Sequence, residues 1–93
     1  MIERRDGHLR VTAPMVMANA RGLLEAGRSA LKQADETVDL GSVDEADSSA
    51  LAVMLGWLRT AEARGTRLAF ANLPDGVRAL AELHGVIDLL PRA

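Results

Sequence analysis

The stretch from Thr37 to Leu55 constrains the fold of this chain more than any other segment. It begins with a short strand-like run, continues through an acidic turn, and opens an amphipathic segment at Asp47, Ser48 and Ser49. Aspartate and serine are favoured at helix N-caps, because their side-chain oxygens accept hydrogen bonds from the free backbone N–H groups of the first turn. A strand that leads through a polar turn into a capped helix is the first half of a β–α–β unit, so this stretch predicts an α/β fold.

The flanking segments continue the same alternation. Alternating polar and apolar residues predict strands, whereas apolar residues that recur on one helical face predict helices. The predicted strands cover residues 8–12, 37–40 and 67–71, with shorter strands at 15–17 and 86–87. The predicted helices run from about 19 to 34, from 48 to 64 and from 74 to 84.

Individual residues mark the predicted boundaries. Asn19 is the expected N-cap of the first helix, and Gly65 is the expected residue after the second helix. Asp35 and Glu36 are interpreted as a turn before the middle strand. The inner side of the third helix is expected to end on His84 or Leu83.

The strand pattern also predicts how the layers stack. A sheet buried on both faces has strands that are apolar throughout, whereas these strands alternate. We therefore expect a mixed sheet of four or five strands, with three helices mostly on one face. The length of 93 residues predicts a single domain over residues 1–93.

Composition and charge argue against several functions. A net charge of −2 and an aromatic content of 2% disfavour a nucleic-acid partner, which requires a basic face or a stacking platform. Cysteine is absent, so there is neither a disulfide nor a thiol nucleophile. The chain starts without the apolar region of a signal peptide, and no apolar run approaches the roughly 20 residues of a membrane helix. We expect a cytoplasmic protein that reaches a membrane only indirectly, through a partner.

The polar residues do not form a recognisable catalytic or metal-binding motif. Ser48 or Ser49 could be grouped with His84 and an aspartate, but the nucleophile elbow of serine hydrolases is missing. The acidic residues between Asp39 and Asp47 lack the spacing of an oxygen-ligand loop. The sequence therefore predicts neither enzyme activity nor a bound metal or cofactor.

The Asp-Ser-Ser turn contains more capping residues than a helix needs. One of the three explains the cap, which leaves a hydroxyl of Ser48 or Ser49 as a candidate switch or contact point. Trp57, the only tryptophan, lies beside the predicted core stripe of the second helix. Packing against a neighbouring helix is the favoured role of Trp57, and an anchor at a partner interface is the alternative.

Three segments together resemble the STAS domain family. They are Val38–Leu40, Val43–Leu51 and Arg64–Leu68. STAS domains carry Asp-Ser-Ser-Gly-Leu or Asp-Thr-Gly-Gly-Leu at the start of a helix, and this chain has Asp-Ser-Ser-Ala-Leu at residues 47–51. The second half, with residues 72–86 and the closing Leu-Pro-Arg, is similar to the MlaB branch of the family.

The resemblance implies a STAS fold and a non-catalytic cytoplasmic subunit. Proteins of the MlaB type bind the ATPase of an ABC transporter that moves phospholipids between the membranes of diderm bacteria. The implied partner is therefore an ATPase subunit, which this chain would stabilise or regulate. The candidate contact and switch residues are Asp44, Asp47, Ser48, Ser49, Leu51 and Trp57.

The resemblance leaves a second function open, that of an anti-sigma factor antagonist. Such proteins bind a serine kinase or anti-sigma factor and are switched by phosphorylation at the Asp-Ser-Ser turn. The antagonist pattern places the switch hydroxyl at Ser49, whereas the MlaB-like pattern places it at Ser48. STAS domains often carry Gly-Glu-Leu-Asp before the first helix, and in antagonists that region supports kinase recognition. This chain has Ala13–Val16 there, which weakens the interpretation as a phosphorylation switch.

Overall fold

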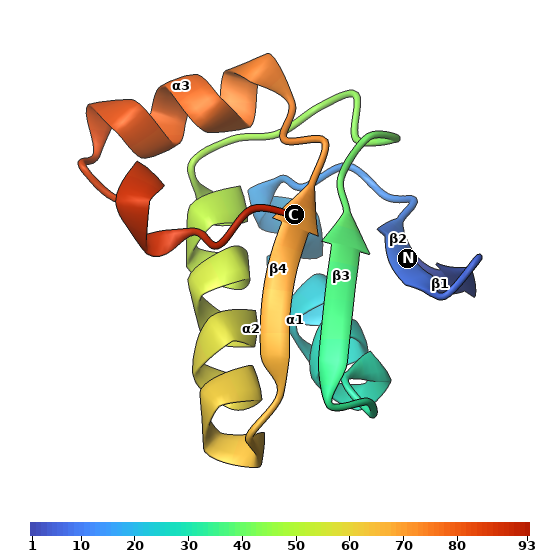
Figure 1. The fold of residues 1–93 in the computed structure, drawn as a ribbon. Helices are drawn as coiled ribbons and strands as arrows, with labels where there is room; N and C mark the ends of the chain where they lie inside the picture. Colours follow the sequence, from blue (N-terminus) through green and yellow to red (C-terminus); the bar gives the residue numbers. More distant parts are fainter.

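A four-stranded mixed sheet forms the centre of the fold in the computed structural model, which describes residues 1–93 (Figure 1). The strand order is β1-β2-β3-β4; β1 runs antiparallel to β2, and β2, β3 and β4 run parallel to one another. The strands are β1 (Ile2–Arg5), β2 (His8–Val11), β3 (Asp35–Asp39) and β4 (Arg67–Ala71). The helices are α1 (Ala20–Ala30), α2 (Ser49–Arg64) and α3 (Asp75–Leu83), with 3₁₀ turns η1 (Met17–Asn19) and η2 (Ile87–Leu89). The predicted fold class is confirmed.

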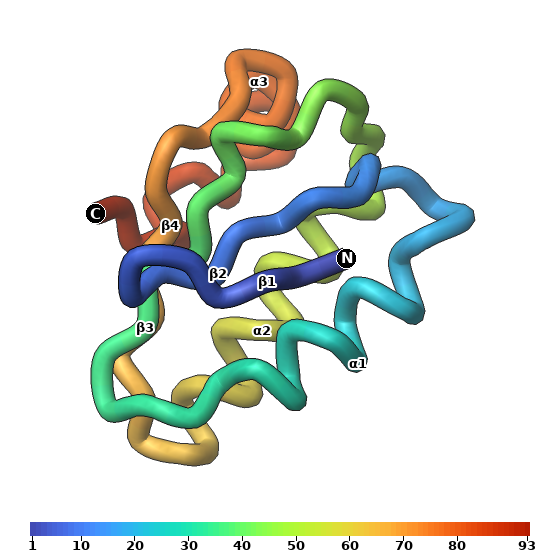
Figure 2. Tube along the Cα trace, turned by 90° about the vertical axis from the view of Figure 1, so that its right-hand side faces the viewer, coloured from blue at the N-terminus to red at the C-terminus, as the bar shows by residue number.

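The helices α1 and α2 cover one face of the sheet, and α3 lies near the carboxyl end of β4 (Figures 1 and 2). In β3 and β4 every second side chain is buried, including Val38, Leu68 and Phe70. The side chains between them are exposed or half-buried, because no helix covers the other face. One cluster of 19 buried apolar residues fills the space between sheet and helices. The predicted one-sided layering is confirmed.

Strand β1 was not predicted from the sequence. Its four residues include only one apolar side chain, Ile2, so the strand has no alternating pattern to detect. The turn that creates it is visible, because Asp6 and Gly7 both have positive φ, 53° and 82°. Two central residues with positive φ suit the hairpin turn that matches strand twist, and this turn pairs Ile2 with Val11.

Several predicted boundaries were wrong. Residues 15–17 form no strand: Met15 makes one parallel bridge with Ala46, and the chain then enters η1. Helix α1 ends at Ala30, four residues before the predicted end, and the side chain of Asn19 does not cap it. Instead, the Asn19 amide donates a hydrogen bond to the Pro14 carbonyl, at 2.9 Å.

The C-terminal segment also differs from its prediction. Residues 86–87 are not a strand, and both Leu83 and His84 are exposed rather than on the inner side of α3. The C-terminal tail pairs with the outer edge of β4. The N–H of Phe70 donates to the Pro91 carbonyl at 2.7 Å, and the Phe70 carbonyl accepts the N–H of Ala93 at 2.9 Å. This pairing covers part of an otherwise open sheet edge.

Helices α1 and α2 cross at very close range. A Cβ atom on Gly27 would lie 2.0 Å from Nε1 of Trp57, so only glycine fits there. The indole is 1% exposed, and its N–H donates to the carbonyl oxygens of Leu23 and Leu24 at 3.1 and 3.3 Å. Trp57 thus packs between the two helices, as the favoured interpretation has it, and the ring presents almost no surface to a partner in this conformation.

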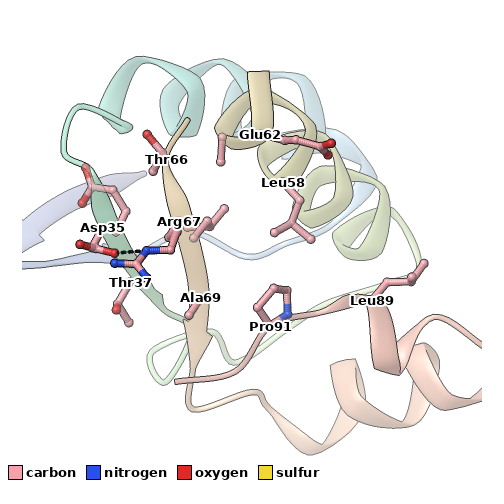
Figure 3. Close-up of a pocket in the computed structure, with 12 residues that line it drawn as sticks. Asp35, Thr37, Leu58, Glu62, Thr66, Arg67, Ala69, Leu89 and Pro91 are labelled. Atoms are coloured by element: carbon pink, nitrogen blue, oxygen red, sulfur yellow. Dashed lines mark hydrogen bonds and ion pairs between the residues drawn. The ribbon is translucent and has the colours of Figure 1, made fainter. Parts of the chain in front are cut away.

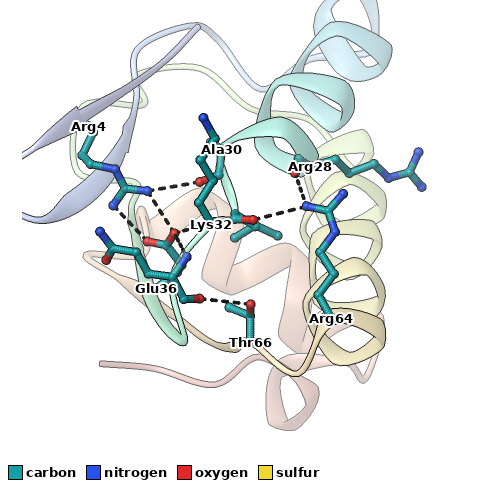
Figure 4. A network of polar contacts seen from close by, with 9 residues as sticks. Arg4, Arg28, Ala30, Lys32, Glu36, Arg64 and Thr66 are labelled. Atoms are coloured by element: carbon teal, nitrogen blue, oxygen red, sulfur yellow. Dashed lines mark hydrogen bonds and ion pairs between the residues drawn. The ribbon is translucent and has the colours of Figure 1, made fainter.

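A buried carboxylate ties the hairpin to the rest of the sheet (Figure 4). Glu36 was predicted in a turn but lies in β3 with 2% exposure, and it forms an ion pair with Arg4 at 2.9 Å. It also accepts the backbone N–H groups of Lys32 and Gln33 at 3.0 and 3.1 Å. Burial acts to raise the pKa of Glu36, but these hydrogen bonds outweigh it and hold the pKa below its ordinary value.

Candidate functional site

Asp47 caps helix α2. Its Oδ1 accepts the backbone N–H of Ser49 at 2.8 Å and the Ser49 hydroxyl, and its carbonyl accepts the N–H of Ala50 at 3.0 Å. Ser48, the residue directly before α2, has helical φ and ψ of −63° and −18° and forms no side-chain cap bond, so Asp47 supplies the side-chain acceptor of an N-cap to Ser49, the first residue of α2. Of the three candidate capping residues, Asp47 therefore fills the role, and Ser49 is bound to it.

The same carboxylate reaches across to the segment before α1. Its Oδ2 accepts the backbone N–H of Met17 at 3.0 Å, so Asp47 joins η1 to the start of α2. The pKa of Asp47 lies below its ordinary value. The main cause is the hydrogen bond from the Ser49 hydroxyl, and the N–H groups of Met17 and Ser49 add to it. Asp47 is consequently ionised at neutral pH and holds the two segments together.

The hydroxyl of Ser48 is the free one. Ser48 is exposed, and its side chain makes no hydrogen bond in the structure. It stands at the amino end of a helix of 16 residues, where unpaired N–H groups and the helix dipole favour negative charge. The structure thus distinguishes the two serines: Ser49 is engaged with Asp47, and Ser48 faces solvent.

The other predicted site residues divide between surface and core. Asp44 is exposed, as is its neighbour Glu45, and neither forms an ion pair. Leu51 is 6% exposed and belongs to the core cluster, like Trp57. The structure therefore brings Asp44, Asp47 and the two serines together on one turn and places Leu51 and Trp57 beneath the surface.

A second carboxylate fixes the other end of this turn. Asp39, the last residue of β3, accepts the N–H of Gly41 at 2.8 Å and the side-chain amide of Asn72 at 3.0 Å. Asn72 has a φ of 56°, a conformation that asparagine adopts more readily than most residues. The hydrogen bonds from Asn72 and Gly41 hold the pKa of Asp39 below its ordinary value. The segment between Gly41 and Asp47 is thus anchored at both ends.

A hollow lies elsewhere, beside the outer edge of β4 (Figure 3). Its volume is about 800 Å³, and its walls include Leu58, Leu89 and Pro91 on one side and the ion pair of Arg67 with Asp35, at 2.8 Å, on the other. No histidine, serine or cysteine lines it, so it offers no paired nucleophile and base. None of the predicted site residues borders this hollow.

Other chemical features are sparse. No three side chains of the metal-binding types come close enough to hold an ion. His84 is exposed at the end of α3 and makes no side-chain hydrogen bond, so it does not activate either serine. None of the helices combines the length and apolar character that crossing a bilayer requires.

Solved structures with the same architecture are STAS-domain proteins and their relatives. The unphosphorylated anti-sigma factor antagonist SpoIIAA matches with a TM-score of 0.74 and 17% identity, covering 100% of this chain and 86% of SpoIIAA. A putative anti-sigma factor antagonist from Thermotoga maritima matches with a TM-score of 0.78 and 14% identity, over 99% of this chain and 83% of the other. A sulfate transporter family protein from Wolinella succinogenes matches with a TM-score of 0.68 and 17% identity, over 87% and 67%. At these identities the likeness establishes the fold, which is that of a STAS domain.

The sequence identifies the family more narrowly. The profile of the MlaB STAS domain family matches residues 2–91, so the chain belongs to that family. No curated protein matches the chain. STAS domains are typically non-catalytic and generally mediate protein–protein interactions, and this agrees with a site built from a capped turn rather than from reactive groups.

Proposed function

We propose that this chain is a non-catalytic subunit that binds the ATPase of a phospholipid-transporting ABC transporter and stabilises or regulates it. The observation that carries the proposal is the exposed, unbonded Ser48 on a helix start that Asp47 holds rigidly, in a chain of the MlaB STAS family. A rigid turn presents the same surface to every partner molecule, which lowers the entropy cost of binding. The protein then resides in the cytoplasm and meets the inner membrane through the transporter.

A second function is supported by the same hydroxyl. The likeness to SpoIIAA extends to its phosphorylated form, with a TM-score of 0.69 and 16% identity. A phosphate on Ser48 would lie at a helix N-terminus, where backbone N–H groups stabilise it. In this alternative the chain is an anti-sigma factor antagonist, and its partner is a serine kinase or an anti-sigma factor.

Co-expression with the ATPase subunit of a phospholipid-transporting ABC transporter from the same organism tests the first function. The two proteins should elute as one complex, and ATPase activity should change when this chain is added. Separate elution with unchanged ATPase activity contradicts the proposal. Capture of a serine kinase that then phosphorylates Ser48 supports the antagonist function instead.

Substitutions at the turn test the site. Ser48→Asp should fold normally, with a loss below roughly 1 kcal/mol, because aspartate suits the first turn of a helix. In the complex the new carboxylate is desolvated without a partner, which can cost roughly 2–5 kcal/mol of binding free energy. Ser48→Ala should retain more binding than Ser48→Asp. If both variants melt and bind like the wild type, Ser48 lies outside the interface.

Ser49 provides the matched control. Its hydroxyl donates to Asp47, so Ser49→Asp places two carboxylates side by side and removes a bond of the cap. We expect Ser49→Asp to lower the melting temperature, whereas Ser48→Asp does not. If Ser49→Asp loses both stability and binding, the result does not identify a contact. If Ser48→Asp loses binding while its stability is unchanged, the result identifies Ser48 as a contact.

A further inference from the structure

An exposed methionine adjoins the Asp47 turn. Met17 is 77% exposed, although its backbone is held in place because its N–H donates to Asp47 Oδ2 at 3.0 Å. The other exposed large apolar side chains are Met1, Leu83 and Leu89. Of the four, Met17 is the one bonded to the candidate site. Methionine is a flexible, polarizable side chain that fills irregular apolar pockets on partner proteins.

The acidic residues of the turn run alongside this methionine. Met15 donates to the Glu45 carbonyl at 2.9 Å and accepts from the Asp47 N–H at 3.1 Å, so residues 15–17 lie beside residues 45–47. Asp44 and Glu45 are exposed and form no ion pair. The surface therefore combines one projecting apolar side chain with carboxylates that lack a cation of this chain.

We propose that Met17 is the apolar anchor of the docking surface, and that Asp44 and Glu45 pair with basic residues of the partner. This inference rests on the proposed function and specifies the complementary surface on the ATPase: an apolar pocket bordered by lysine or arginine side chains. Exposed carboxylates without an ion-pair partner in this chain attract a basic surface and increase its association rate. The buried apolar contact then determines how slowly the complex dissociates.

Equilibrium and kinetic binding to the purified ATPase test the apolar anchor. Met17→Ser should weaken affinity by about ten-fold or more, as expected for an interface residue worth more than about 1.4 kcal/mol. Leu83→Ser is the matched control, because Leu83 is 78% exposed and is the last residue of a different helix, α3. Affinity should not change in this control. Equal affinities of the Met17→Ser and Leu83→Ser proteins overturn the inference.

The salt dependence of association tests the charged part. The double variant Asp44→Asn with Glu45→Gln should associate several-fold more slowly at low ionic strength and lose most of its dependence on salt. Glu82→Gln with Asp88→Asn changes the net charge equally, at exposed residues around α3 and η2, and should associate like the wild type. Identical salt dependence of the two double variants contradicts the charge pairing.

The outcomes separate this inference from the proposed function. Absence of binding by the wild-type chain refutes both, whereas tight wild-type binding that survives Met17→Ser refutes only the anchor. A second copy of this chain is the competing occupant. Size-exclusion chromatography tests whether the wild type forms a dimer. If Met17→Ser abolishes that dimer but leaves ATPase binding intact, Met17 mediates self-association and the inference is overturned.

Discussion

Replacing Gly27 by alanine should destabilise the protein sharply, even though the same change usually stabilises a helix. The added Cβ would lie 2.0 Å from Nε1, 2.3 Å from Cε2 and 2.7 Å from Cδ1 of Trp57. The indole is buried and cannot move aside without pushing on the core, so one of the two helices must shift.

The size of the effect follows from three terms. Overpacking a core costs typically 1–3 kcal/mol. A displaced indole that no longer reaches Leu23 and Leu24 leaves a buried donor unpaired, at about 1–3 kcal/mol. Alanine recovers about 1 kcal/mol of helix propensity. We expect a net loss of about 1–5 kcal/mol, a large share of the stability of a domain of this size.

Gly22 offers a control on the same helix. A Cβ there meets only the flexible end of Met1, at 3.1 Å, so Gly22→Ala should stabilise the protein by up to about 1 kcal/mol. Urea denaturation followed by circular dichroism measures both free energies of unfolding. If the Gly27→Ala and Gly22→Ala proteins are equally stable, the close crossing of α1 and α2 does not restrain residue 27.

Two further predictions concern the buried and capping carboxylates. Glu36→Gln should cost about 1–3 kcal/mol, since it replaces charged acceptors of Arg4, Lys32 and Gln33. The pKa of Glu36 is depressed in the folded protein, so its contribution to folding stability is complete above the unfolded pKa of about 4.3 and is lost as pH falls through the folded value. The acid denaturation curve of Glu36→Gln should therefore lack this pH-dependent component. Asp47→Ala should speed amide hydrogen exchange at Ser49 and in η1 but not in β4, and equal protection in both proteins would contradict its role as the link.

Helices and strands with a clear apolar pattern were predicted from the sequence, whereas a strand that is held by pairing with its neighbour was missed. The range of β4 and the end of α2 before Gly65 agree with the prediction, because alternation and a left-handed glycine at φ 71° are local signals. Strand β1 was missed because it is held by a hairpin turn and by the Arg4–Glu36 ion pair rather than by apolar residues of its own.

The candidate site shows the same division. The Asp-Ser-Ser motif identified the start of α2 and an excess hydroxyl, but which serine is free depends on the direction of the Asp47 side chain. The contribution of Met17 could not be predicted, because its contact with Asp47 joins residues 30 positions apart. Leu83 and His84 are exposed where α3 ends, and the apolar spacing of the helix did not show that its inner side stops before them.

The burial of Trp57 has a spectroscopic consequence. Since it is the only tryptophan and there is no tyrosine, its indole is the main source of near-ultraviolet fluorescence in the protein. The ring is sealed between α1 and α2 and its N–H bonds to carbonyls of α1, so separating these helices transfers the fluorophore to water and alters its emission. Ser48 and Met17 lie on the surface, so a partner that docks there leaves the surroundings of the indole unchanged. The chain therefore carries an internal reporter that distinguishes loss of the fold from occupation of the binding surface, without any added label.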